Sequence, residues 1–227
     1  MSDTAAVTTA PAPIWPMYRS MVGIGLICGV LLVGAFQITK PIIERNKAEA
    51  LARAIFQVLP EAASSKTFAL GEDGRFTILE GKPAGQAIVY GGYDGTGRLV
   101  GMAVEAAGMG YQDTIRLLYG YAPEQNAIVG IQVLDSKETP GLGDKIIFDP
   151  EFLANFTRLD VTLAEDGSGL AHDIVSVRHG QKSQAWQIDA ITGATVSSNA
   201  IANILNKSAA RFVPLIQAHV DDFRETE

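Results

Sequence analysis

Residues 99–134 have the sequence LVGMAVEAAGMGYQDTIRLLYGYAPEQNAIVGIQVL, in which three apolar runs alternate with turn-forming segments. The runs are 99–105, 114–119 and 128–134, and glycine, aspartate and proline occur between them. Short apolar runs bounded by such residues are typical of β-strands joined by short connections. We therefore expect consecutive antiparallel strands in this part of the chain.

The same pattern continues on both sides of this stretch. Further strands are predicted at 75–79, 86–90, 174–177 and 186–190. A short helix is predicted from Asp149-Pro150 to Phe156, because an aspartate cap followed by proline is typical of a helix start. A longer helix is predicted at 196–213, where apolar residues recur at helical spacing. Together these elements predict an α+β domain with a mixed, mainly antiparallel sheet and flanking helices.

The N-terminal part of the chain predicts a membrane anchor. Residues 20–39 contain no charged residue and follow a tail of residues 1–19. About 20 apolar residues suffice for one transmembrane helix. A cleaved signal sequence is the alternative, but the small residues Ala48-Glu49-Ala50 lie too far beyond the apolar run to be its cleavage site.

A connecting amphipathic helix is predicted at 40–60, between the anchor and an extramembrane domain at 61–227. Pro41 suits a first helical turn, and apolar residues then recur at helical spacing until Pro60 ends the pattern. Basic residues are more numerous after the anchor than before it, which favours a cytoplasmic domain. This rule weakens when a long folded domain follows the helix.

Composition limits the chemistry that the chain can perform. The formal net charge is −7, and Lys and Arg are not clustered, which argues against nucleic acid as a partner. Cys28 is the only cysteine, so the chain cannot form an intrachain disulfide, an iron-sulfur cluster or a cysteine zinc site by itself. The three histidines are isolated, and no metal site is predicted. Electron transfer by this chain would therefore require an organic cofactor.

One candidate cofactor-binding segment is Asp189-Ala190-Ile191-Thr192-Gly193-Ala194-Thr195, which leaves a predicted strand and enters the helix at 196–213. Thr195 is therefore expected at or just before a helix N-terminus, where unpaired N–H groups and the helix dipole favour a phosphate. The small residues Gly193 and Ala194 let a ligand approach the backbone. The alternative is an ordinary threonine helix cap.

A second segment is the loop 137–145, with the sequence KETPGLGDK. Pro140 and two glycines fix its conformation, and such a loop offers backbone donors to a ring or a phosphate. The alternative is an ordinary turn, because Gly-Leu-Gly alone has little specificity.

The anchor, residues 110–134, the KETPGLGDK loop and the 189–195 segment together resemble the G subunit of the Rnf-type ion-translocating electron transport complex. The resemblance implies FMN attached through a phosphodiester to Thr195 by a separate flavin transferase, with Thr192, Gly193 and Ala194 beside the phosphate. It also implies that the loop lies near the flavin, through Glu138, Thr139, Gly141 and Leu142. In place of the histidine usual in the family two residues before the glutamate, this chain has Ser136.

The resemblance further implies an electron carrier in a complex that couples electron flow between ferredoxin and NAD to ion transport. Its partners would be the other membrane subunits, and its large domain would lie on the periplasmic side of a bacterial inner membrane. The flavin would supply the redox chemistry, so no independent catalytic residue is expected. Two alternatives are the C subunit of the sodium-translocating NADH:quinone reductase and a non-redox, membrane-tethered interaction module.

Overall fold

The computed structural model describes residues 14–79 and 85–224, and the chain divides into two units, Met1–Glu49 and Ala50–Glu227. The predicted N-terminal tail lies outside the described residues up to position 13. Most of one long helix belongs to the first unit, whereas the second unit contains the end of that helix and the sheet domain.

Helix α1 spans Ile14–Val58. It contains the segment predicted as a transmembrane helix and all but the last two residues of the predicted connecting helix. Its large apolar side chains from Met21 to Ile38 are exposed. By length and composition this helix is able to cross a membrane. A lipid bilayer would cover side chains that are otherwise unfavourably exposed to water.

The predicted helix start at Pro41 is not observed, because α1 continues through this residue. Proline removes one backbone donor from a helix and costs about 3 kcal/mol in a helix interior. In an apolar segment, a complete break would leave several backbone groups unpaired, which costs more. The preceding turn keeps additional bonds, since the Thr39 hydroxyl donates to the Ala35 carbonyl oxygen at 2.8 Å.

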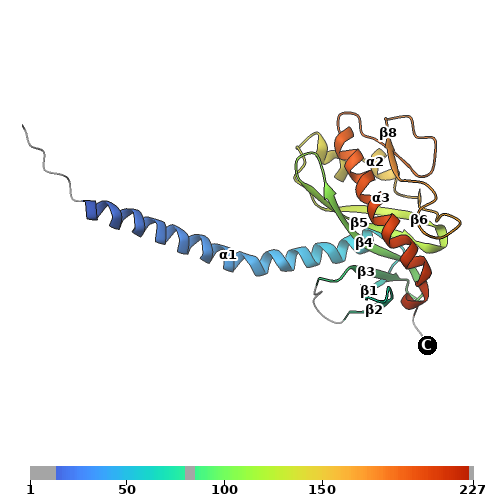
Figure 1. Ribbon diagram of the computed structural model, residues 1–227, viewed down its shortest axis with the longest axis horizontal. Coiled ribbons are helices and arrows are strands. Elements are labelled where there is room, and N and C mark those ends of the chain that lie inside the picture. The colour runs from blue at the N-terminus through green and yellow to red at the C-terminus, as the bar shows by residue number, and fades with distance from the viewer. Residues whose placement is uncertain (1–13, 80–84, 225–227) are drawn as a thin grey trace, which may run out of the picture. The chain divides into compact units, whose positions relative to one another are not determined.

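Seven strands form one sheet in the order β2-β1-β3-β4-β5-β6-β7, and all its neighbouring strands are antiparallel (Figure 1). Their bounds are β1 Ser64–Leu70, β2 Phe76–Ile78, β3 Ile88–Tyr93, β4 Leu99–Met109, β5 Thr114–Ala122, β6 Ala127–Asp135 and β7 Leu159–Asp160. Strands β4, β5 and β6 confirm the three strands predicted in 99–134, whereas β1 and β7 were not predicted. Strands β8 Val175–Val177 and β9 Gln187–Asp189 pair in parallel as a separate sheet. The α+β class with a mainly antiparallel arrangement is confirmed, although the parallel pair forms a sheet of its own and does not make the main sheet mixed.

Short helices complete the domain together with the long helix α3, Thr195–Ala218. They are α2 Pro150–Ala154 and the 3-10 helices η1 Pro123–Gln125, η2 Gly143–Ile147 and η3 Val220–Phe223. The predicted cap of α2 is confirmed, because the Asp149 carboxylate accepts the N–H groups of Glu151 and Phe152 at 3.1 and 3.0 Å. Helix α3 extends beyond its predicted end at Val213 and through Pro214. Burial of Ile216 on the next turn offsets the loss of one helical hydrogen bond.

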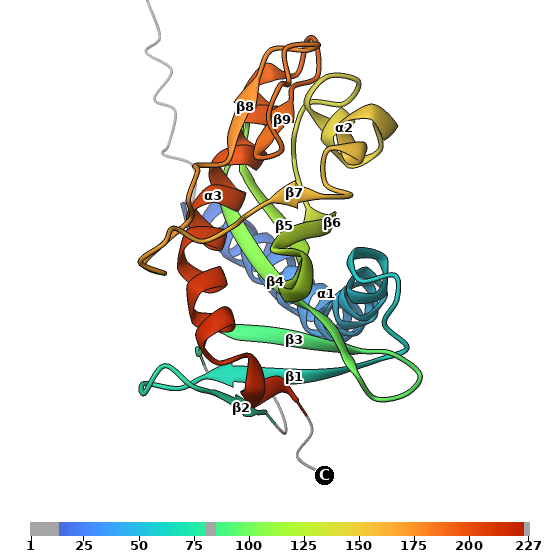
Figure 2. The same cartoon turned by 90° about the vertical axis from the view of Figure 1, so that its right-hand side faces the viewer.

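The two faces of the sheet bury different helices, because successive side chains of a strand point to opposite faces. Met102 and Val104 of β4 belong to the larger core cluster, which contains the apolar side of α3. Ala103, between them, belongs to a second cluster with Ile55 and Val58 at the end of α1. Figure 2 shows α3 running along the sheet. The sheet thus fixes the N-terminus of α3, where the predicted site residues begin.

Candidate cofactor site

A cleft of about 350 Å³ lies at the N-terminus of α3. Its lining residues come from three segments that are far apart in the sequence: Tyr111, then Thr139, Leu142 and Gly143, then the five residues Gly193–Ser197. The fold therefore brings the KETPGLGDK loop and the 189–195 segment to one place. Each of these segments was singled out separately from the sequence.

Thr195 is the first residue of α3, and its side chain is exposed. The cap position is occupied by Ala194, which has no side-chain hydrogen bond to the first turn. Among the described residues, none forms a hydrogen bond with the Thr195 hydroxyl. The structure therefore does not support the alternative that Thr195 is an ordinary helix cap. Its hydroxyl is available at the positive end of a 24-residue helix.

The loop before Thr195 has a fixed conformation. Gly193 has φ +86°, in the left-handed region that a residue with a Cβ adopts only with strain. The Ser198 hydroxyl is fully buried and donates to the Ala194 carbonyl oxygen at 3.0 Å. The same hydroxyl accepts the N–H of Ile191 at 3.1 Å. A residue of α3 thus holds both sides of the turn that precedes Thr195.

Glu138, predicted to lie near the flavin, is buried and its carboxylate binds groups of the protein. One carboxylate oxygen accepts the N–H groups of Tyr111 at 2.9 Å and Gln112 at 3.0 Å. The other accepts the hydroxyl of Ser197. The Glu138 N–H in turn donates to the Ser136 hydroxyl at 3.2 Å. Ser136 therefore supports the backbone of this loop.

The remaining predicted residues occupy different places. Thr139 and Leu142 line the cleft, whereas Gly141 is exposed in the loop with φ +77°. Thr192 lines a neighbouring hollow of about 200 Å³, together with Lys145, His179 and Asp189 among others.

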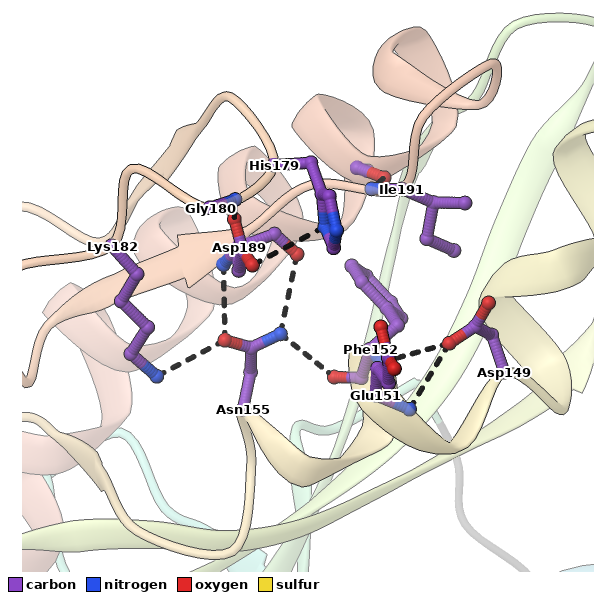
Figure 3. Close-up of polar contacts among 10 residues, drawn as sticks. Asp149, Glu151, Phe152, Asn155, His179, Gly180, Lys182, Asp189 and Ile191 are labelled. Carbon is purple, nitrogen blue, oxygen red and sulfur yellow. Dashed lines mark hydrogen bonds and ion pairs between the residues drawn. The ribbon is translucent and has the colours of Figure 1, made fainter.

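Figure 3 shows the polar contacts beside this second hollow. The buried side chain of Asn155 accepts the Asp189 N–H at 3.0 Å and donates to its carbonyl oxygen at 3.2 Å. The Asp189 carboxylate accepts the Gly180 N–H at 2.8 Å and lies 3.3 Å from Nδ1 of His179. Lys182 donates to the side-chain amide oxygen of Asn155. Burial lowers the pKa of this lysine, while Asp189 acts in the opposite direction. Hydrogen bonds from buried side chains therefore fix the backbone at both the start and the end of the 189–195 segment.

Four lining residues were not predicted as site residues: Tyr111, Gly143, Val196 and Ser197. Gly143 lies in the loop that the sequence did single out, and the two α3 residues follow Thr195 directly. Tyr111 is the least predictable, because it lies in the turn between two strands and reaches the cleft only through the fold of the sheet.

Comparisons with known proteins agree with this arrangement. The sequence model of the FMN-binding domain family matches residues 110–210, which include the lining residues of the cleft. NqrC from Shewanella oneidensis has the same fold, with a TM-score of 0.56 at 18% identity over 79% of this chain and 96% of that chain. The C subunit of the Na(+)-translocating NADH-quinone reductase from Parabacteroides distasonis is similar to the same degree, over 81% of this chain and 96% of that chain. These likenesses concern the fold.

Curated relatives match at higher identity over most of the chain. The G subunit of the ion-translocating oxidoreductase complex of Methanosarcina acetivorans is 31% identical over 214 residues, which are 92% of this chain and 95% of the relative. The corresponding protein of Stutzerimonas stutzeri is 30% identical, over 78% of this chain and 73% of the relative. That of Haemophilus influenzae strain 86-028NP is 27% identical, over 82% and 84%. The chain belongs to the family formed by the G subunits of ion-translocating oxidoreductase complexes.

Proposed function

We propose that this chain carries electrons within a membrane-bound ion-translocating oxidoreductase complex, and that it does so through FMN bound covalently to Thr195. The observation that carries the proposal is the position of the Thr195 hydroxyl. It is exposed, has no hydrogen-bond partner among the described residues, and stands at the first residue of α3 on the wall of the cleft.

The phosphate of FMN fits the N-terminus of α3. The first-turn N–H groups of a helix have no partner within the helix, and Ala194 provides no side-chain cap for them. The helix dipole adds a favourable interaction with negative charge of about 0.3 to 1 kcal/mol. The left-handed turn at Gly193 brings no Cβ close to this position. A phosphodiester at the Thr195 oxygen would therefore meet unpaired donors and no steric obstacle.

The ring of FMN fits the apolar wall of the same cleft. Tyr111, Leu142 and Val196 line the cleft with side chains that are 69%, 52% and 55% exposed. Exposed apolar side chains gathered at one cleft are typical of a binding surface. When bound, the isoalloxazine ring of FMN supplies the capacity to accept and release electrons. The side chains of the cleft retain and orient it, and no residue is required as a general acid or base.

The family resemblance supports attachment by a separate flavin transferase. The lining residues of the cleft include no histidine, lysine or carboxylate. The new bond joins the threonine oxygen to the phosphorus that carries the flavin. The bond from this phosphorus to the leaving group of an activated flavin nucleotide breaks, and the partner enzyme removes the hydroxyl proton. The other partners are the membrane subunits of the complex, to which α1 anchors this domain.

Denaturing electrophoresis tests the attachment. We expect flavin fluorescence to migrate with the full-length chain when it is expressed with a flavin transferase, and Thr195→Ala to abolish it without loss of the fold. Thr77→Ala removes another exposed threonine, on β2 outside the cleft, and should keep full fluorescence. Fluorescence that persists in the Thr195 variant would place the attachment elsewhere.

We also propose that the sheet domain lies on the periplasmic side, although the basic residues after the anchor favour the cytoplasm. The family resemblance supports the periplasmic side. A C-terminal alkaline phosphatase fusion, which requires export for activity, should be active, and a fusion to a reporter that functions only in the cytoplasm should be silent. The reverse pattern would show that the flanking charges determine the topology.

A further inference from the structure

We infer that Glu138 is a charged positioning residue, which joins the three walls of the cleft from beneath and keeps a negative charge next to the cofactor. This inference rests on the proposed function, because it concerns the site in which FMN is proposed to bind. It differs from direct cofactor binding, since the Glu138 carboxylate is turned toward the protein and only 5% of the residue is exposed.

The contacts of the carboxylate connect segments that are distant in the sequence. The donors are the Tyr111 and Gln112 N–H groups of the turn after β4, and the Ser197 hydroxyl in the first turn of α3. Glu138 itself belongs to the loop before η2. Its side chain therefore connects this loop to the turn after β4 and to the first turn of α3. Tyr111 and Ser197 also line the cleft. Any movement of the carboxylate would therefore change the width of the cleft.

Two glycines leave room for the carboxylate and for nothing larger. A Cβ at Gly110 would lie 2.5 Å from one oxygen of Glu138, and a Cβ at Gly143 would lie 2.7 Å from the other. The Cβ at Gly143 would also lie 2.8 Å from the Ser197 hydroxyl. The backbone at Gly110 and at Gly143 thus packs directly against this acid. A side chain at position 143 would displace the Glu138 carboxylate, which explains the glycine there.

The charge of Glu138 is balanced by neutral donors. Its three partners donate and none accepts, which is the set that an ionised carboxylate satisfies. No described basic side chain forms an ion pair with it. Burial of an acid without a cation is costly, and an amide of the same shape would avoid part of this cost. A negative charge next to the flavin disfavours reduction of the flavin, because reduction adds electrons.

Substitutions can separate the positioning effect from the charge. Glu138→Gln keeps an oxygen toward the two N–H groups, and its amide can donate to Ser197, whose hydroxyl is able to accept. Glu138→Ala removes both the connection and the charge. Ser197→Ala breaks one connection and keeps the charge. Glu124→Ala, at an exposed glutamate of η1 outside the cleft, is the matched control.

The first measurement needs no flavin and uses the full-length Thr195→Ala protein in detergent. In this background, amide hydrogen exchange at Tyr111 and Gln112 should accelerate at least tenfold with Glu138→Ala and remain unchanged with Glu124→Ala. If Glu138→Ala does not fold, Glu138→Leu serves instead, because it fills the space of the side chain but offers the two N–H groups no acceptor. Unchanged exchange at both amides would overturn the positioning role, whatever the fate of the flavin proposal.

The second measurement uses the flavin-bearing protein. We expect Glu138→Gln to retain the flavin and to raise its midpoint potential, because a negative charge that opposes reduction is removed. A tenfold change in the reduction equilibrium corresponds to about 30 mV for a two-electron couple. Ser197→Ala should shift the potential less than Glu138→Gln does. An unchanged potential in a fully flavinylated Glu138→Gln protein would overturn the role of the charge, whereas absence of flavin from the unmodified protein would contradict the proposed function alone.

Discussion

Two glycine-rich parts of the sheet domain differ in what glycine does for them. Beneath the end of α1, glycines of neighbouring strands are required because the helix end lies directly on the sheet: a Cβ at Gly101 would lie 2.8 Å from Leu59, and one at Gly120 would overlap the backbone of Val58. Around the cofactor cleft, Gly141 and Gly193 have open space for a Cβ, but their φ values are +77° and +86°. The first part needs glycine for close packing, whereas Gly141 and Gly193 of the second part need it for backbone conformation.

The contact between the end of α1 and the sheet stabilises the domain, whereas the turns around the cleft determine the shape of the cofactor site. The end of α1, from Ala54 to Val58, packs closely against the sheet, so a change there should act on folding. The cleft is built from turns whose own conformation matters, so a change there should act on the cofactor. Substitutions of comparable chemistry in the two parts should therefore have different consequences.

The largest expected effect is on stability, from Gly120→Val in β5. The added side chain would displace the end of α1 from the sheet, and overpacking of this kind costs about 3 kcal/mol or more. Chemical denaturation followed by tryptophan fluorescence measures the loss. Gly95→Val is the matched control, because nothing lies within 4 Å of a Cβ there and its φ is not positive. Equal stability of the two variants would show that the end of α1 does not pack tightly against β5.

A smaller effect on stability, together with a cofactor effect, is expected from Gly141→Val in the loop. The left-handed conformation costs a residue with a Cβ about 1 to 2 kcal/mol, so the loop should shift. We expect an altered flavin spectrum or midpoint potential with the flavin still attached to Thr195. Gly169→Val, at an open position without a positive φ, controls for the added side chain.

Two other results at Gly141 would be informative. A fully flavinylated variant with unchanged spectrum and potential would mean that the loop is an ordinary turn without influence on the cofactor. A folded variant that loses the attachment would indicate that the flavin transferase recognises this loop.

The smallest expected effect on the cofactor is that of Asn155→Ala. Asn155 is buried and bonds both backbone groups of Asp189, and its loss would leave them unpaired at a cost of about 1 to 3 kcal/mol each in a fully buried site. Asp189 is partly exposed, so water can replace some of these bonds and the loss should stay near the lower limit. We expect flavin attachment to become slower, measured as the rate of fluorescence gain with purified transferase. An unchanged rate would mean that the start of the 189–195 segment need not be held firmly.

Much of the fold follows from local patterns, and the exceptions have physical causes. The strands of 99–134 are apolar runs separated by turn residues, which is why they could be predicted from that stretch alone. Strand β1, SSKTFAL, begins with polar residues and lacks a clear alternation, and β7 has only two residues. Pro41 and Pro214 both indicate helix ends locally, but surroundings outside the local sequence keep the helices continuous. Tertiary context therefore decided the helix limits, and local propensity decided where most strands lie.

The candidate site divides in the same way. Each of the two segments was compatible with a phosphate or ring site, because a helix start and a glycine loop are local features. The residues alone left a helix cap and an ordinary turn as alternatives. Their meeting was not predictable from spacing, since Glu138 and Ser197, which bond to each other, are 59 positions apart. Tyr111 joins them from a third segment for the same reason. Local sequence thus indicated the chemistry of the parts, and only the fold shows how they are assembled.

Mass spectrometry of the peptide that carries Thr195 tests the central claim most directly. Trypsin cleaves after Lys182 and Lys207, so one peptide contains Thr192, Thr195 and the serines of the first turn of α3. Fragmentation of this peptide then distinguishes these hydroxyls. We expect the mass of one FMN less one water, linked through the phosphate and located at Thr195. An unmodified peptide from flavin-bearing protein, or FMN located at Thr192, would contradict it.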